Sequence, residues 1–296
     1  MRLLAGIAAL LLAQALCAQV ASKRLDLSTR PQSAKSYFVV FAARGESLTG
    51  HAFVAWGIED GVSRRSTLRA LGLYPENAGN NCSSMVRTVP GRVMDEMLNH
   101  SVQSISVELI VRVDPALYDR SWKVAHAWDC RNEFSLITHD CVEFLRAVAD
   151  SLHLPMPRRT PLHWTPQAYV RAMIASVSEG TIETPDGVYS GSLMDRKPVG
   201  RGTLRFADES YIEGAFWGLD HHIGKGRLNI DGGYRYEGAI VDYHAQGRGT
   251  LWRIRDGREW EEPQILVQGI FEAGRAKQKS AAEVVDVSKP HSPALK

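Results

Sequence analysis

Two interleaved series of glycines in the second half of the chain restrict how it can fold. Gly191, Gly214 and Gly238 each close a triplet led by tyrosine or isoleucine, at spacings of 23 (214−191) and 24 (238−214) residues. The second series repeats a Gly-basic-Gly motif with the same period: Gly200-Arg201-Gly202, Gly224-Lys225-Gly226 and Gly247-Arg248-Gly249. This period predicts strand–turn–strand units, and the units must stack because one hairpin cannot bury its own apolar face.

The units resemble MORN repeats, whose pattern is Tyr-Glu-Gly, a variable turn and Gly-x-Gly. Tyr236-Glu237-Gly238 with the motif at 247–249 matches best, Ser190 and Ile212 are departures, and a degenerate fourth unit begins at Val267. The resemblance implies a stacked β-hairpin MORN-repeat domain over residues 178–274 that binds a protein partner, a membrane lipid or the substrate. Residues 275–296 are polar and are predicted to be a disordered tail.

The first residues have the pattern of a secretory signal. Arg2 precedes the apolar run from Leu3 to Leu12, and small residues stand before Gln19, so residues 1–18 are predicted to be a cleaved signal peptide. The protein is then exported, to the periplasm or outside the cell. No later apolar stretch is long enough to span a membrane. The net charge of +2 gives no electrostatic case for a nucleic-acid partner.

Three cysteines, Cys82, Cys130 and Cys141, remain after the signal peptide. An odd number in an exported protein calls for an explanation. A Cys82–Cys130 disulfide with Cys141 left free is the economical arrangement in an oxidising compartment. The alternative is that all three are reduced and buried.

Residues 36–177 read as an α+β domain that follows a flexible lead-in over residues 19–35. Runs rich in β-formers predict strands at 37–42 and 51–57, joined as a hairpin, and further strands at 66–73 and 104–113. Asp-Pro at 114–115 and Thr-Pro at 165–166 open helices. Residues 76–100 show no readable pattern. A small antiparallel sheet with a few helices is therefore expected.

A third helix is predicted to begin at Cys141. Asp140 is a good N-cap, Glu143 completes a capping-box pattern, and Phe144, Leu145, Val148 and Leu152 form the core-facing side. A helix N-terminus favours negative charge, so a thiol there ionises easily. This makes Cys141 a candidate nucleophile, although a lone cysteine on an apolar face is more often a core residue.

A thiol nucleophile needs a base, and His51 stands at the start of a strand directly after Gly50. Gly50-His51-Ala52-Phe53 on a strand, followed by Asp140-Cys141-Val142-Glu143-Phe144 on a helix, resembles the permuted papain-like fold of the NlpC-type and lecithin retinol acyltransferase-like groups. That resemblance implies a cysteine hydrolase or acyltransferase that works through a thioester and needs no cofactor. Cys141 would be the nucleophile and His51 the base. Asp140 stands where those groups have asparagine.

The residue that orients the histidine stays open. In the groups named above it lies on the strand after the histidine strand, where Ser66 or Thr67 is the nearest candidate, and His139 is an alternative through its closeness to Cys141. The substrate is expected to be a peptide, an isopeptide or a lipid ester, with amide hydrolysis slightly favoured.

Two other functions are consistent with these residues. His126, Cys130, His139 and Cys141 offer four ligands for zinc, but their spacing fits no standard structural site. The first domain would otherwise be a non-catalytic scaffold, with the repeats performing the binding.

Overall fold

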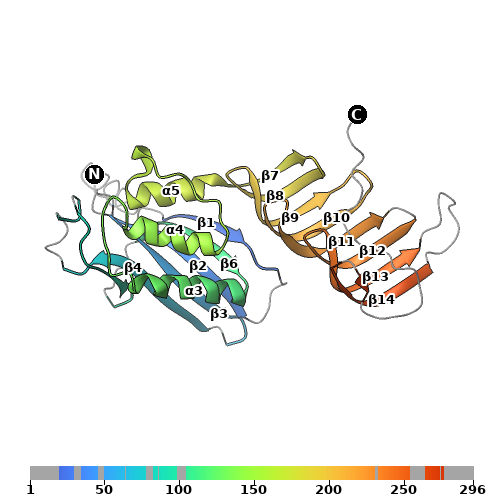
Figure 1. Cartoon of the computed structure of the whole chain (residues 1–296), viewed down its shortest axis with the longest axis horizontal. Coiled ribbons are helices and arrows are strands. Elements are labelled where there is room, and N and C mark those ends of the chain that lie inside the picture. Colours follow the sequence, from blue (N-terminus) through green and yellow to red (C-terminus); the bar gives the residue numbers. More distant parts are fainter. Residues whose placement is uncertain are drawn as a thin grey trace, which may run out of the picture.

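The computed structural model describes residues 20–29, 35–45, 50–63, 65–77, 83–85, 87–98, 105–230, 233–253, 264–273 and 275–276. The predicted signal peptide, Cys82 and residues 277–296 of the predicted tail lie outside these residues. Within them the chain is α+β and mostly strand, with two antiparallel-rich sheets and three α-helices (Figure 1).

The first sheet has six strands in the order β1-β6-β2-β3-β4-β5. The hairpin of β2 (Lys35–Arg44) and β3 (His51–Asp60) confirms the prediction for this pair, and β4 (Arg65–Pro75) confirms the third strand. Strand β5 (Gly91–Asp95) lies in the region without a readable pattern, and β6 (Ile105–Val113) agrees with the strand expected at 104–113.

The prediction of a flexible lead-in is wrong for its first part. Residues Ala21–Asp26 form β1, which pairs in parallel with β6. The polar composition hid this strand because it lies at the edge of the sheet, where one face stays in water. Leu25 and Leu27 nevertheless point into the core and are almost completely buried.

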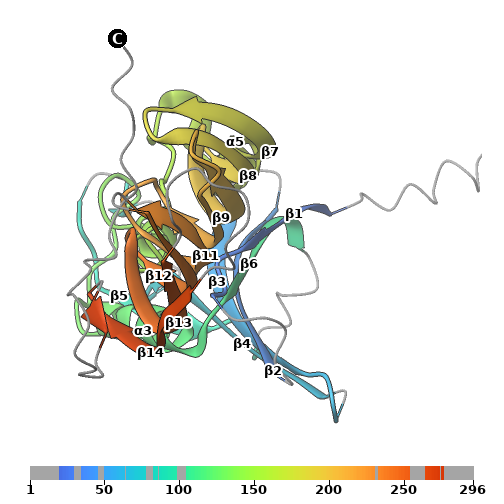
Figure 2. The same ribbon diagram turned by 90° about the vertical axis from the view of Figure 1, so that its right-hand side faces the viewer.

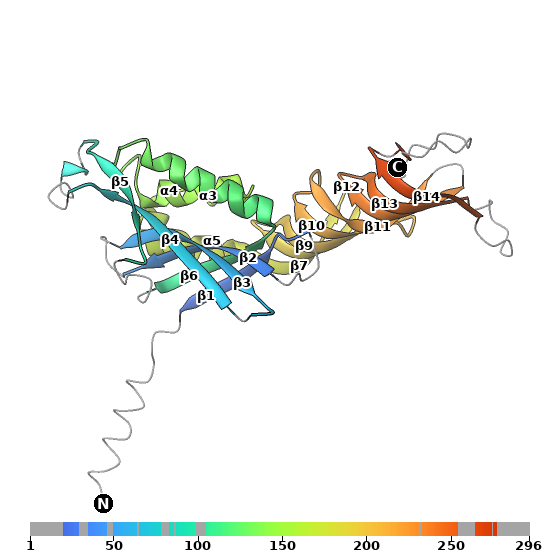
Figure 3. The same cartoon turned by 90° about the horizontal axis from the view of Figure 1, so that it is seen from below.

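Three helices cover one face of this sheet: α3 (Pro115–Asp129), α4 (Cys141–Ser151) and α5 (Pro166–Ser176). Figure 3 shows α3 and α4 on one side of it. Alternate residues of β3, namely Ala52, Val54 and Trp56, enter the shared core, and each large apolar side chain buried there contributes roughly 1.5–3 kcal/mol. The predicted starts of all three helices are confirmed. The side chain of Asp114, however, caps no helical amide and instead accepts hydrogen bonds from the amide and hydroxyl of Thr29.

The second sheet contains β7 (Val177–Thr184), β8 (Gly187–Met194), β9 (Lys197–Arg205), β10 (Tyr211–Trp217), β11 (His222–Ile230), β12 (Tyr234–Val241), β13 (His244–Arg253), β14 (Gln264–Glu272) and β15 (Arg275–Ala276). Every strand pairs antiparallel with its neighbour in the chain, so the sheet is a continuous meander. Viewed along the long axis, its strands turn progressively (Figure 2). The prediction of a disordered tail is wrong for Arg275 and Ala276, which pair with β14.

The repeated glycines face one another across these strands. Gly214 pairs with Gly202 on one side and Gly224 on the other, while Gly249 pairs with Gly238 and Gly269. A Cβ on Gly214 would lie 2.3 Å from the carbonyl oxygen of Ile223, so no larger residue fits. The buried rings of Tyr189 and Tyr236 occupy the space above Gly202 and Gly249. This register explains why the aromatic and glycine positions share one period.

The two sheets share a core where they meet. Val177, Met194 and Val199 of the second sheet belong to the same buried cluster as Leu25 of β1. Lys23 of β1 donates a hydrogen bond to the carbonyl oxygen of Val177. Strand β1 therefore joins both parts of the molecule.

Candidate active site

The N-terminus of α4 is held by Asp140 and Arg159. One carboxylate oxygen of Asp140 accepts the amides of Val142 and Glu143, both at 3.0 Å, while the Asp140 carbonyl accepts the amide of Phe144. The remaining amide of the first turn, that of Cys141, lies near its own sulfur atom. The predicted cap is confirmed, but the reciprocal half of the capping box is replaced, since Glu143 pairs with Arg146 at 2.9 Å.

The thiol of Cys141 lies against the start of β3. Its side chain is buried, and the backbone amide of Ala52 lies near enough to it to lower the pKa of the thiol. Burial raises the pKa of the Cys141 thiol to about 12, and the Asp140 carboxylate adds to the rise. The expectation of an easily ionised thiol is wrong for this resting structure, because desolvation outweighs the helix N-terminus. The thiol is therefore neutral and needs a base.

His51 is the residue before Ala52 and stands beside a buried carboxylate. Its Nε2 lies 2.9 Å from Oε1 of Glu96, whose side chain is wholly inaccessible to solvent. This hydrogen bond passes over Gly72 of the intervening strand, where a Cβ would lie 2.3 Å from Oε1 and 2.4 Å from Nε2. Nδ1 makes no hydrogen bond within the described part of the chain, so it can accept a proton.

Tyr74 and Arg44 complete the surroundings of Glu96. The Tyr74 hydroxyl donates to Oε1 at 2.6 Å and its ring stacks on His51 with centroids 4.1 Å apart. Arg44 lies 3.4 Å from the other oxygen of Glu96 and donates to the Tyr74 hydroxyl. Burial lowers the pKa of His51, although the bond to Glu96 opposes the shift. A neutral imidazole is thus held by a carboxylate, as a general base requires.

The three candidates for the orienting residue do not occupy that place. Ser66 pairs with Glu59 and Thr67 with Ile58, at the far end of β3. These positions are eight (59−51) and seven (58−51) residues from His51, or roughly 23–26 Å at the usual rise per strand residue. An antiparallel neighbour runs backwards, so the end of β4, with Gly72 and Tyr74, lies beside His51. The ring of His139 bonds the hydroxyl of Thr138 instead.

Glu96 was missed because it follows β5 in the region that showed no pattern. Its amide is fixed by the carbonyl oxygen of Ala70 at 2.8 Å. Gly72 was the signal available in the sequence, since a glycine inside a strand often marks close approach of another group.

The metal alternative finds no support in the described part of the chain, where no three histidine, cysteine or acidic side chains gather as a metal site. His126 bonds the carbonyl oxygen of Trp122, while Cys130 is exposed and Cys141 buried. Cys130 carries a free thiol. The predicted Cys82–Cys130 disulfide is therefore not formed in this structure, whose described residues do not include Cys82.

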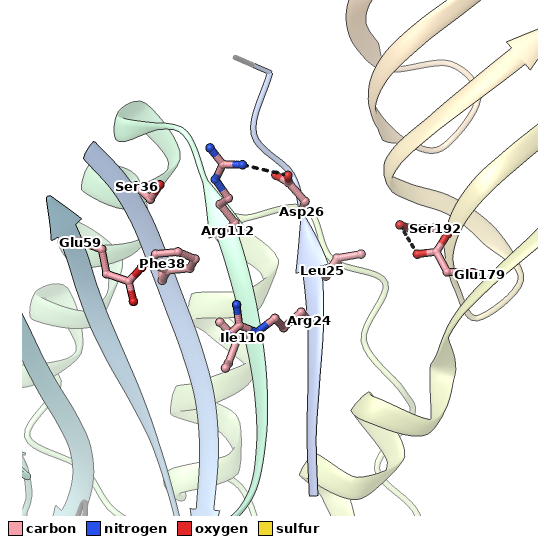
Figure 4. A pocket seen from close by; sticks show the side chains of 10 residues that line it. All are labelled: Arg24, Leu25, Asp26, Ser36, Phe38, Glu59, Ile110, Arg112, Glu179 and Ser192. Atoms are coloured by element: carbon pink, nitrogen blue, oxygen red, sulfur yellow. Dashed lines mark hydrogen bonds and ion pairs between the residues drawn. The ribbon is translucent and has the colours of Figure 1, made fainter. Parts of the chain in front are cut away.

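A cleft of about 390 Å³ lies elsewhere, at the junction of the two sheets (Figure 4). Arg24 and Arg112 line it from the first sheet, and Glu179 and Ser192 from the second. The cleft lies beside Glu59, at the end of β3 opposite to His51. It is therefore separate from the thiol and the imidazole.

No known protein family, curated protein or solved structure matches this chain. Among the described residues no helix has the length and apolar character needed to cross a membrane.

Proposed function

We propose that the protein is an exported cysteine hydrolase or acyltransferase that acts on amide or ester bonds through a thioester on Cys141. One observation carries the proposal. Cys141, which opens α4, lies against Ala52, the residue after His51. The Nε2 atom of His51 is bonded to the buried carboxylate of Glu96.

The same observation supports a permuted papain-like fold for the first sheet and its helices, because the histidine strand precedes the cysteine helix. Glu96 takes the orienting role. The glycine register of the second sheet supports a MORN-type module that binds a protein partner, a membrane lipid or the substrate.

The chemistry follows from the arrangement of these groups. Nδ1 of His51 accepts the thiol proton as Sγ of Cys141 attacks the substrate carbonyl carbon. The backbone amide of Cys141 donates to the oxyanion that forms. His51, now positively charged and stabilised by Glu96, returns the proton to the leaving amine or alcohol. Water, or an acceptor amine or alcohol, then releases the acyl group from the thioester and regenerates the thiol.

The substrates expected are peptides, isopeptides and lipid esters. Amides are slightly favoured, because the sequence of residues 36–177 gives no indication of a long apolar acyl slot. Screening of the mature protein against peptidoglycan fragments, isopeptides and phospholipids, with Cys141→Ala as the inactive control, identifies the bond that is cleaved.

Reaction with iodoacetamide tests the nucleophile directly. Peptide mapping reads each thiol separately, so the exposed Cys130 is an internal control that should react independently of His51. We expect His51→Ala to slow alkylation of Cys141 by at least about tenfold, as expected for loss of a general base. If Cys141 reacts only after unfolding, or if His51→Ala changes nothing, the catalytic proposal is wrong.

A second function is a non-catalytic binding protein, favoured by the burial of Cys141 and by the cleft at the other end of β3. In that case His51 and Glu96 would be a structural pair. Binding to peptidoglycan or vesicles that is unchanged in Cys141→Ala, without turnover of any substrate, would support it.

A further inference from the structure

Asp140 is an unusual neighbour for a thiol that must become negative. Its side chain is only 4% exposed, and it lies next in sequence to Cys141. A carboxylate so placed disfavours a second negative charge nearby. Any use of Cys141 as a nucleophile therefore needs something that offsets Asp140.

Arg159, in the segment between α4 and α5, is the group in contact with that carboxylate. Its guanidinium grips both oxygens, with Nη1 3.0 Å from Oδ1 and Nη2 bonded to Oδ2. Such two-point pairing is the strong, directional form of an arginine–carboxylate contact. The side chain is 10% exposed and stacks on Trp164, with its Cζ 4.4 Å from the ring centre.

The Nε atom of Arg159 does not help to hold this side chain in place. Nε is buried and has no hydrogen-bond partner among the described residues. A secondary contact reaches Glu143 at 3.7 Å, beyond hydrogen-bond distance. The Nε donor of Arg159 is thus left without a hydrogen bond. Its pairing with Asp140 and its stacking on Trp164 hold the side chain in position.

We propose that Arg159 is a positioning residue, which locks the Asp140 cap of α4 and offsets its charge when Cys141 becomes a thiolate. This inference rests on the proposed function. It adds that an aspartate can precede the nucleophilic cysteine when an arginine pairs with its carboxylate. Arg159 touches neither substrate nor thiol in this role.

The direction of the electrostatics agrees with the geometry. After burial, Asp140 raises the pKa of Cys141, whereas Arg159 lowers it. The other charged or titratable groups near this pair are Glu143 and Arg146 of α4, Tyr169 of α5 and His51 of β3, which itself bonds Glu96. Among the described residues, Arg159 is the only one with a charged side chain bonded to the Asp140 carboxylate.

The test is a double-mutant cycle on the full mature chain, read by the pH dependence of Cys141 alkylation. Arg159→Met should slow alkylation about tenfold at neutral pH and move its apparent pKa upward by about one unit, since one pKa unit is tenfold in thiolate. Asp140→Asn with Arg159→Met removes the uncompensated carboxylate and keeps a cap, and should recover a rate within about threefold of the parent.

Arg146→Met is the matched control, because Arg146 pairs with Glu143 of the same helix at 2.9 Å and does not touch Asp140. Its rate should stay within about twofold of the parent, as for a part-exposed pair. Thermal melting checks folding in each variant. If Arg159→Met does not fold, the double variant still shows whether Asp140 alone creates the need for the arginine.

Three results would decide against the inference: an unchanged rate in Arg159→Met, no recovery in the folded double variant, or an equal loss in Arg146→Met. Failure of the proposed function has a different signature. In that case the single variant His51→Ala would leave the alkylation rate of Cys141 unchanged, whatever the rate in Arg159→Met.

Discussion

The two sheets meet the same steric demand, close contact across neighbouring strands, at very different distances along the chain. In the repeat sheet Tyr236 packs over Gly249 on the next strand. In the first sheet Gly72 lets His51 reach Glu96, which is 45 residues away in sequence. A strand glycine thus makes room for a side chain of a nearby repeat strand in one sheet, and for a contact between distant segments in the other. Only the first kind leaves a regular trace in the sequence.

The largest expected effect is the removal of the buried carboxylate of the first sheet. Glu96→Ala leaves Arg44 and His51 without their partner, and breaking a buried charged pair typically costs about 3–5 kcal/mol, less here because Arg44 is 24% exposed. Urea unfolding measures the loss. Glu96→Gln keeps the shape, so it should cost less stability while still slowing alkylation of Cys141. Equal stability of Glu96→Ala and the parent would contradict the network.

The repeat sheet should be sensitive to a substitution at Gly214. A Cβ there meets only backbone, 2.3 Å from the Ile223 oxygen and 2.5 Å from the Cα of Gly224. Gly214→Ala should therefore destabilise the protein by about 1–3 kcal/mol through overpacking. Gly57→Ala in β3 is the matched control, since its Cβ would have no neighbour closer than 3.8 Å. Similar unfolding midpoints for the two variants would sink the steric account.

The Gly72→Ala variant distinguishes an effect on the candidate active site from an effect on the stability of the first sheet. The new methyl group would occupy the place where Glu96 and His51 meet, but both groups are side-chain ends that can move. We expect alkylation of Cys141 to slow about tenfold, as for an impaired base, with a smaller loss of stability than in Gly214→Ala. Unaltered alkylation in Gly72→Ala would show that the His51–Glu96 bond does not support the base.

The smallest expected effect is on the pH dependence of folding stability. Each sheet contributes to it through one buried histidine. Burial lowers the pKa of His51 in the first sheet and of His222 in the second. Each unfolded histidine then binds a proton more readily than the folded one. Stability from each is present above the unfolded pKa of about 6.5 and is lost as the pH falls through the folded value. His51→Gln and His222→Gln should each flatten the fall in melting temperature between pH 7 and 5. A steeper fall in either would reverse the sign.

Local rules were sufficient for much of the fold. The hairpin of β2 and β3, the starts of the three helices and the period of the repeat sheet all depend on residues within one or two elements of one another. Apolar alternation and capping residues act over such distances, so these features were predictable. They also placed Cys141 at a helix start and His51 at a strand start.

Only the tertiary structure decided the rest. Strand β1 has a polar composition and gains its place by pairing with β6, far along the chain. Glu96 and Arg159 reach the site from segments without a periodic pattern, through contacts that span 45 and 19 residues. Burial, which set the direction of the Cys141 and His51 pKa values, is likewise a property of the assembled core. The sequence by itself determined which elements form, whereas packing determined which side chains meet, because contacts between distant segments leave no period to read.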